Sequence, residues 1–228
     1  ADGDEDKIEH IKMKQLIGVE QNPQMFTLAC SNMILRHDGK SNMINGSCFS
    51  DEVHKKIKEL EPTVCLINPP YSQSDNDESE LSFINNALKL LKQNGKLVAI
   101  VPLSSAIEDN DLKNSQRRDI LKSNTLEAVF TMPGELFYPV GTHTCVMVFT
   151  AKQPHGTPEV VKIPKSNNKR KKANKDTVEY EMVEVIKARK PTYFGYWKDD
   201  GFVKTKTMGR CDKFNKWESI KELWLKTY

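Results

Sequence analysis

The sequence has 228 residues, with 34 Lys and Arg against 31 Asp and Glu and a hydrophobic share of 38%. This apolar content suffices for the core of one large α/β domain and is too low for a membrane protein. No segment approaches the roughly 18 unbroken apolar residues of a spanning helix, and the acidic N-terminus differs from a secretory signal. We therefore expect a cytoplasmic protein without a membrane-spanning segment.

The first half of the chain alternates short apolar runs with amphipathic segments. The run at residues 15–20 is typical of a buried parallel strand. Asn22 is an N-cap and Pro23 a first helical residue, and apolar side chains recur at helical spacing to about residue 35. Further elements are expected as a strand at 41–45, a helix at 52–60, a strand at 63–67, a helix from 80 to 93 and a strand at 96–101.

The second half changes rhythm. Strands at 126–132 and 144–150 are joined by a connection that contains Pro and Gly, and residues 180–188 fit either a strand or a helix. The order predicts βαβ units, a mostly parallel sheet covered on both faces, and an antiparallel edge. We also expect a short strand near 159–163 and a terminal helix at 217–225. The chain divides into three expected parts: a catalytic core at 1–164, a basic loop at 165–176, and a C-terminal extension at 177–228 that packs on the core.

The five cysteines are odd in number, scattered along the chain and never arranged as a CxxC pair. This pattern supports neither a disulfide framework nor a zinc ribbon. We expect reduced thiols, most of them packed as small apolar residues. No sequence motif typical of a metal site occurs, so no metal is expected.

The strongest chemical signal is Asn68-Pro69-Pro70-Tyr71 at the carboxyl end of an expected strand, where open α/β sheets bind ligands. Two prolines stiffen the chain and have no N–H, so nearby carbonyls remain free to accept hydrogen bonds. An amino group held by the side-chain oxygen of Asn68 and the carbonyl of Pro69 would lose conjugation and become nucleophilic, while Tyr71 stacks on its base. The motif favours alkylation of an exocyclic amine over a simple Pro-Pro turn.

On this motif the chain resembles the amino-directed, S-adenosylmethionine-dependent methyltransferases with an (Asn/Asp/Ser)-Pro-Pro-(Tyr/Phe) sequence. Residues 137–149 are similar to the segment of the late hairpin in the modification subunit of type I restriction-modification systems. The likeness runs from about residue 16 to 150, and more faintly through 197–202 and 209–212. It implies a Rossmann-like class I methyltransferase sheet, S-adenosylmethionine as cofactor, and site-specific methylation of adenine N6 in DNA. The implied partners are DNA and a specificity subunit, with a restriction subunit as a further candidate.

The resemblance also assigns roles to single residues. Glu20 stands where the family places an acid that contacts the ribose of the cofactor. A carboxylate at a strand end can accept hydrogen bonds from two vicinal hydroxyls. The alternative interpretation is that Glu20 only ends a strand that faces solvent. Ser47 stands where the family often has an acid near the cofactor adenine, and a turn-forming Ser explains it equally well. Phe137 matches a position where the family often has a second aromatic residue that contacts the target base. A phenylalanine that only packs in the core is an equally good interpretation. No general base is evident.

One part of the family pattern is missing. The glycine-rich cofactor loop and the strand before it should precede residue 16, yet residues 1–14 contain one glycine and no apolar run. By the resemblance, the absent strand is the central one, between the strand that ends at Glu20 and the strand that runs into Asn68. We therefore expect a fragment of a larger methyltransferase that by itself binds cofactor poorly.

Positive charge is concentrated in one segment. Residues 165–175 hold six basic side chains and no acidic one, so the rest of the chain has a net charge of −3 although the whole carries +3. The composition predicts a solvated, flexible loop. It is either a disordered linker or a loop that follows DNA phosphates through Lys169, Arg170, Lys171 and Lys172.

Three functions remain open for the complete protein. The first is a type I-like DNA adenine methyltransferase in which Tyr71 stacks on a flipped-out adenine. The second is transfer of the methyl group to protein glutamine or to an RNA base, because the four-residue motif does not separate these substrates. The third is an inactive methyltransferase-like module for DNA binding or assembly, which the missing cofactor loop favours and the intact motif opposes.

Overall fold

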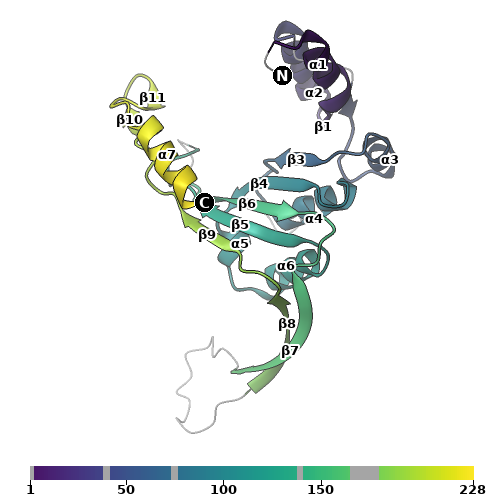
Figure 1. Ribbon diagram of the computed structural model, residues 1–228, viewed down its shortest axis with the longest axis vertical. Helices are drawn as coiled ribbons and strands as arrows, with labels where there is room; N and C mark the ends of the chain where they lie inside the picture. Colours follow the sequence, from purple (N-terminus) through teal and green to yellow (C-terminus); the bar gives the residue numbers. More distant parts are fainter. Residues whose placement is uncertain (1–2, 38–41, 73–76, 138–140, 165–179) are drawn as a thin grey trace.

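The centre of the molecule is a five-stranded sheet (Figure 1). The structure, a computed structural model, describes residues 3–37, 42–72, 77–137, 141–164 and 180–228. In spatial order the strands of the central sheet are β3 (Val64–Ile67), β4 (Lys96–Pro102), β6 (Thr144–Thr150), β5 (Thr125–Thr131) and β9 (Tyr193–Tyr196). β3, β4, β5 and β9 run in one direction, and β6 runs against both of its neighbours. The expected mostly parallel sheet with an antiparallel β5–β6 hairpin is confirmed, and β9 pairs beyond that hairpin.

Helices α4 (Glu80–Leu90) and α6 (Asp111–Ser123) cover one face of this sheet. Leu81, Ile84 and Leu88 of α4, with Leu91 directly after it, form an apolar stripe with exposed fractions of only 0 to 1%. It packs against the side chains of β4 and β6 that point to the same face. The members of this core include Leu81, Ile84, Leu88, Leu91, Leu97, Ala99, Val101, Cys145, Met147 and Phe149.

The N-terminal part is a smaller unit of helices around two parallel strands. β1 (Gly18–Glu20) pairs with β2 (Met43–Asn45), and α1 (Glu5–His10), a π-helical turn (Ile11–Gln15), α2 (Pro23–Leu35) and α3 (Asp51–Glu59) surround or follow them. Asn22 is the N-cap of α2, because its side chain accepts hydrogen bonds from the first turn. The unit contacts the main body through a small cluster of Val53 and Ile57 of α3 with Leu90 of α4.

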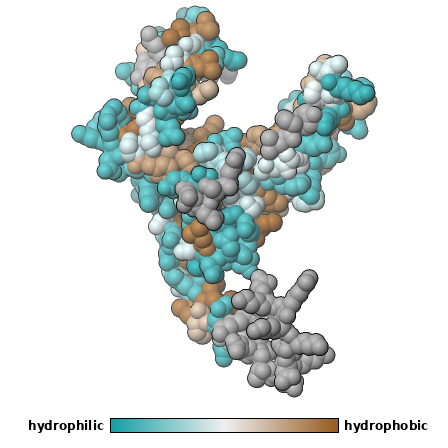
Figure 2. Space-filling model, turned by 180° about the vertical axis from the view of Figure 1, so that it is seen from behind, coloured by the Kyte–Doolittle hydropathy of each residue, from teal (hydrophilic) through white to brown (hydrophobic). Residues whose placement is uncertain are grey.

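The edge of β3 that faces away from β4 has no partner strand among the described residues. Leu66 is 77% exposed and Val64 60%, although apolar parallel strands are normally buried on both faces. Helix α2 buries none of its side chains, and Figure 2 shows apolar surface both on the N-terminal unit and over the centre of the molecule. The expected gap between the strand ending at Glu20 and the strand running into Asn68 is thus present in the fold.

Beyond β6 the chain forms a long hairpin arm and then returns to the sheet (Figure 1). The arm consists of β7 (Gly156–Pro164) and β8 (Tyr180–Ala188), which settles residues 180–188 as a strand. After β9 come the hairpin of β10 (Val203–Thr205) and β11 (Gly209–Cys211) and the terminal helix α7 (Trp217–Thr227). Trp197 stacks between Phe130 of β5 and Trp224 of α7, so aromatic contacts fix this last segment on the sheet.

The burial of α4 gives a direct test of this core. Replacing Leu88, which is 1% exposed, with Ala should lower the free energy of unfolding by about 2 to 5 kcal/mol, because the lost contacts leave a cavity. The matched change Leu112→Ala on α6, where the side chain is 66% exposed, should cost about 0.5 kcal/mol or less. Urea unfolding measures both values, and equal effects of the two substitutions would contradict the packing described.

Candidate active site

The candidate site lies at the edge of the sheet where four strands end. β3, β4, β5 and β9 all have their carboxyl ends at this edge, and antiparallel β6 begins there. Asn68 follows β3, the short helix α5 (Ser104–Ile107) follows β4, and Phe137 lies beyond β5. Open α/β sheets bind their ligands at the carboxyl ends of the strands. The fold therefore brings the motif to the edge that its sequence position predicts.

The motif residues leave hydrogen-bond acceptors available. Pro69 is buried, whereas Asn68 and Pro70 are exposed and Tyr71 is half-buried. Within the described residues, the side chain of Asn68 makes no hydrogen bond to the protein, and the carbonyl of Pro69 accepts none from the backbone. The Asn68 amide oxygen and the Pro69 carbonyl can therefore accept hydrogen bonds from one amino group of a ligand.

Tyr71 and Phe137 are brought together although 65 residues of sequence separate them. Their ring centroids are 6.2 Å apart and their planes meet at 88°, an edge-to-face contact. The Tyr71 hydroxyl is buried and has no hydrogen-bond partner among the described residues. Burial is the main cause that raises the pKa of Tyr71, and the nearby carboxylate of Glu80 raises it further, so the phenol stays neutral. The pair presents aromatic surface beside the free acceptors of the motif.

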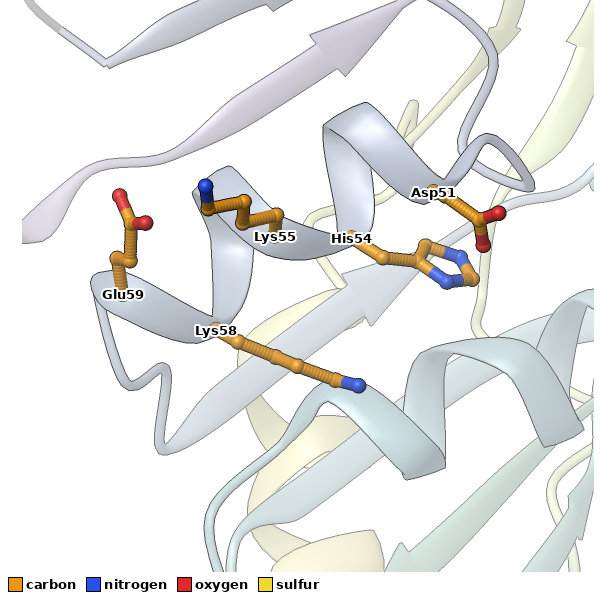
Figure 3. Close-up of a pocket in the computed structure, with 5 residues that line it drawn as sticks. All are labelled: Asp51, His54, Lys55, Lys58 and Glu59. Atoms are coloured by element: carbon orange, nitrogen blue, oxygen red, sulfur yellow. The ribbon is translucent and has the colours of Figure 1, made fainter.

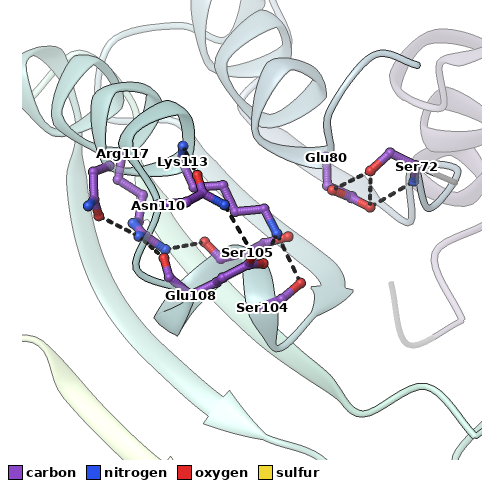
Figure 4. Close-up of polar contacts among 9 residues, drawn as sticks. Ser72, Glu80, Ser104, Ser105, Glu108, Asn110, Lys113 and Arg117 are labelled. Carbon is purple, nitrogen blue, oxygen red and sulfur yellow. Dashed lines mark hydrogen bonds and ion pairs between the residues drawn. The ribbon is translucent and has the colours of Figure 1, made fainter. Parts of the chain in front are cut away.

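The residue after Tyr71 is held by a carboxylate that the sequence did not single out. Glu80, the first residue of α4, is 4% exposed. It accepts hydrogen bonds from the Ser72 backbone N–H at 2.9 Å and from the Ser72 hydroxyl at 3.2 Å (Figure 4). The only sequence signal for this contact is an acid directly after the N-cap Ser79, a pattern that by itself indicates a helix start.

A second polar cluster fixes the chain after β4 (Figure 4). Lys113 of α6 forms an ion pair with Glu108 at 2.5 Å and donates to the Ser104 hydroxyl at 3.2 Å. Arg117 of the same helix donates to the carbonyls of Ser105 and Glu108. The hydrogen bond from Lys113 is the main cause that lowers the pKa of Glu108. None of these residues was predicted to contribute, because residues 104–123 were not expected to form helices.

The expected cofactor residues lie together on the N-terminal unit. Glu20 ends β1, and its Oε1 accepts a hydrogen bond of 2.7 Å from the backbone N–H of Asn22. Ser47 lies just beyond the end of the neighbouring strand β2, and its hydroxyl accepts from the N–H of Phe49 at 3.3 Å. The next residue, Cys48, offers its carbonyl to the Asn86 side chain of α4 at 2.7 Å. Glu20 and Ser47 are thus brought to one edge, on a two-stranded sheet separate from the one that carries Asn68.

Within the ranges that the structure describes, the remaining candidate residues and surfaces add no second site. Lys169, Arg170, Lys171 and Lys172, the expected contacts to DNA phosphates, lie outside the described residues. A shallow hollow on the surface of α3 is lined by side chains of mixed charge from this one helix (Figure 3), so no second element closes over a ligand there. In the described part of the chain, no group of three or more His, Cys, Asp or Glu residues could hold a metal, and no helix is long and apolar enough to cross a membrane.

Comparisons with known proteins identify the family that this chain matches. The model of the N-6 DNA Methylase family matches residues 4–207. The type II restriction enzyme and methyltransferase RM.BcgI of Heyndrickxia coagulans is 41% identical over 155 residues, which are 66% of this chain and 24% of that protein. The StySPI type I methylase subunit of Salmonella potsdam is 24% identical over 151 residues, covering 60% of this chain and 28% of that one.

A solved structure shares the fold. The methyltransferase subunit of a type I restriction-modification system from Streptococcus thermophilus superposes with a TM-score of 0.59 and 18% identity, over 93% of this chain and 42% of that one. The fold is therefore the Rossmann-like sheet of class I methyltransferases. The chain belongs to the N-6 DNA methylase family. It spans about a quarter of the length of the curated relatives that it matches.

Proposed function

We propose that the complete protein transfers a methyl group from S-adenosylmethionine to the exocyclic N6 amine of adenine in DNA, as the modification activity of a restriction-modification system. The observation that carries the proposal is the exposed Asn68 amide and free Pro69 carbonyl at the end of β3, beside the Tyr71–Phe137 ring pair. Membership of the N-6 DNA methylase family supports the same reaction.

The side chains suit this chemistry. Adenine turned out of the duplex would stack on Tyr71, and its amino group would donate to the Asn68 side-chain oxygen and the Pro69 carbonyl. These two acceptors would orient the nitrogen lone pair toward the methyl group that S-adenosylmethionine supplies. No base is required before attack, because the amine can lose its proton to water afterwards. Positioning and electrostatics would then provide most of the rate enhancement.

Glu20 and Ser47 would contact the cofactor. One Glu20 oxygen accepts from Asn22, which leaves the other free for the vicinal hydroxyls of a ribose. Ser47 lies across the parallel strand pair and would contact the adenine ring of the cofactor. These residues suit the ribose and adenine end of S-adenosylmethionine, while the strand missing between β1 and β3 leaves the rest of its cradle incomplete among the described residues.

The comparisons favour two arrangements of the complete system. The likeness to type I methylase subunits supports a modification subunit that works with a separate specificity subunit and a restriction subunit. The higher identity to RM.BcgI supports a chain in which restriction enzyme and methyltransferase are combined. In both arrangements the residues described here would supply part of the methyl-transfer site.

Substitution of Asn68 tests the proposed reaction. In the complete protein, Asn68→Ala should reduce methyl transfer to DNA by at least about 100-fold, because the amine loses a positioned acceptor. Asn32→Ala, on an exposed surface of α2, is the matched control. Transfer is measured with labelled S-adenosylmethionine and DNA, RNA or protein as acceptor. Undiminished transfer by the Asn68 variant, or labelling of RNA or protein instead of DNA, would overturn the assignment.

We further propose that polypeptide outside residues 1–228 supplies a strand between β1 and β3. The unpaired edge of β3, the exposure of Val64 and Leu66, and the uncovered apolar side chains of α2 support this. A parallel strand placed there would join the two sheets through backbone hydrogen bonds. Segments that lead into or out of this strand would cover the sheet face that carries Val64 and Leu66, because parallel sheets are normally covered on both faces.

If such a strand is supplied from outside residues 1–228, this chain alone and the complete protein should differ in their affinity for S-adenosylmethionine. The chain of residues 1–228 alone should bind S-adenosylmethionine at least about tenfold more weakly than the complete protein, because it lacks part of the cofactor cradle. Isothermal titration calorimetry measures both affinities, with circular dichroism to show that the chain is folded. Binding by residues 1–228 in the low micromolar range would contradict this proposal.

The basic segment is proposed to contact DNA phosphates through Lys169, Arg170, Lys171 and Lys172. Replacing its six basic residues with Gln in the complete protein should weaken DNA binding and flatten the dependence of affinity on salt, because fewer counterions are released. The control Lys55→Gln/Lys58→Gln, on α3, should leave the salt dependence unchanged. Fluorescence anisotropy at several salt concentrations measures the slope. An unchanged slope after the six replacements would identify the segment as a linker.

A further inference from the structure

Glu80 is a buried acid whose side-chain hydrogen bonds to the described residues all lead to Ser72, the residue after the motif. Its carboxylate accepts from the Ser72 backbone N–H at 2.9 Å, and from the Ser72 hydroxyl at 3.2 Å on one oxygen and 3.4 Å on the other (Figure 4). No Lys or Arg of the described chain forms an ion pair with it. A buried carboxylate without a basic partner is costly unless donors and dipoles compensate its charge.

The start of α4 provides that compensation. Glu80 is the first residue of this helix, where the unpaired N–H groups and the helix dipole favour a negative charge. The N-cap Ser79 is itself fixed, because the Gln116 side chain of α6 donates to its hydroxyl at 2.8 Å. The next residues of α4, Leu81 and Ile84, are 1% and 0% exposed. The carboxylate thus sits on a rigid support anchored in the core.

This support acts on the position of Tyr71. The N–H of Ser72 belongs to the peptide group that joins it to Tyr71, so the bond to Glu80 fixes the orientation of that peptide. On the other side of Tyr71, the ring of Pro70 restricts the backbone. The chain is therefore constrained immediately before and immediately after the half-buried aromatic residue.

We propose that Glu80 is a positioning residue: by holding Ser72 it fixes the Tyr71 ring in the orientation that stacks on the target base. This rests on the proposed function of the motif. The helix-start position alone does not require such a role. Asp111 occupies the same first position of α6, but its side chain is exposed. Glu80 differs in turning inward to bond the motif loop.

Hydrogen exchange tests the contact without reference to activity. In the complete protein, Glu80→Ala should speed exchange of the Ser72 amide by about tenfold or more, because its acceptor is removed. Asp111→Asn removes an acid from the same helix position and should leave that amide unchanged. Mass spectrometry of peptides that cover Tyr71 and Ser72 measures the rate. Equal exchange in wild type and the Glu80 variant would overturn the proposal.

Kinetics then tests the consequence for catalysis. Glu80→Ala should lower kcat for methyl transfer about 10- to 100-fold with little change in KM for S-adenosylmethionine, since a small misplacement affects only the target base. Glu80→Gln retains one oxygen that can accept from the Ser72 N–H and should recover part of the loss. In a Tyr71→Ala background, Glu80→Ala should add little, because both changes remove the same stacking contact.

The outcomes separate this inference from the proposed function. If the wild-type protein methylates DNA and the loss from Glu80→Ala is equally large in the Tyr71→Ala background, Glu80 does not act through Tyr71. If kcat and thermal stability fall together in Glu80→Ala and Glu80→Gln recovers neither, the role is structural and the inference is wrong. If the wild-type protein methylates no DNA, the proposed function fails, and the exchange of the Ser72 amide still decides whether Glu80 holds the loop.

Discussion

The packing of α4 against β4 and β6 is the constraint on which the rest of this structure depends. One face of the helix lies in the main core with side chains that are at most 1% exposed. Its last turn contributes Leu90 to the cluster that joins the N-terminal unit, and Asn86 bonds the loop that follows β2. Its first residue bonds the loop of the motif. A single buried helix therefore sets the positions of both parts of the candidate site.

This arrangement explains how short, exposed loops can hold a defined geometry. The motif itself is too short to pack a core of its own, and two of its four residues are exposed. Its order comes from the strand before it, from proline stiffness within it and from the Ser72–Glu80 bond after it. The loop after β4 is fixed in the same manner by Lys113 and Arg117 of α6. In each case an acceptor or donor on a helix that packs against the sheet orients a segment at the ligand-binding edge.

The sequence predicted the parts of the fold that have a clear period or a clear cap. The N-cap Asn22, the stripe of α4 and the strands β3 to β6 fall close to their expected limits. The helix α6 was missed because only Ile120 is buried along its thirteen residues, so it has almost no apolar stripe. The strand β8 was ambiguous because a paired arm with two open faces does not require alternating polarity. The contact of Glu80 with Ser72 depends on the direction of one side chain, which no local pattern specifies.

The separation of the two sheets bears on how the site would work. Glu20 and Ser47 belong to the pair β1–β2, while Asn68, Tyr71 and Phe137 belong to the larger sheet. In the described residues the two are joined through α3 and α4, not through strand hydrogen bonds. This joint consists of the buried cluster on α3 and α4, the Phe49–Phe83 ring contact and the Asn86–Cys48 hydrogen bond. Such side-chain contacts can shift more readily than a continuous hydrogen-bonded sheet. A strand between β1 and β3 would fix the distance between the residues proposed to contact the cofactor and those proposed to contact the base, and the proposed methyl transfer depends on that distance.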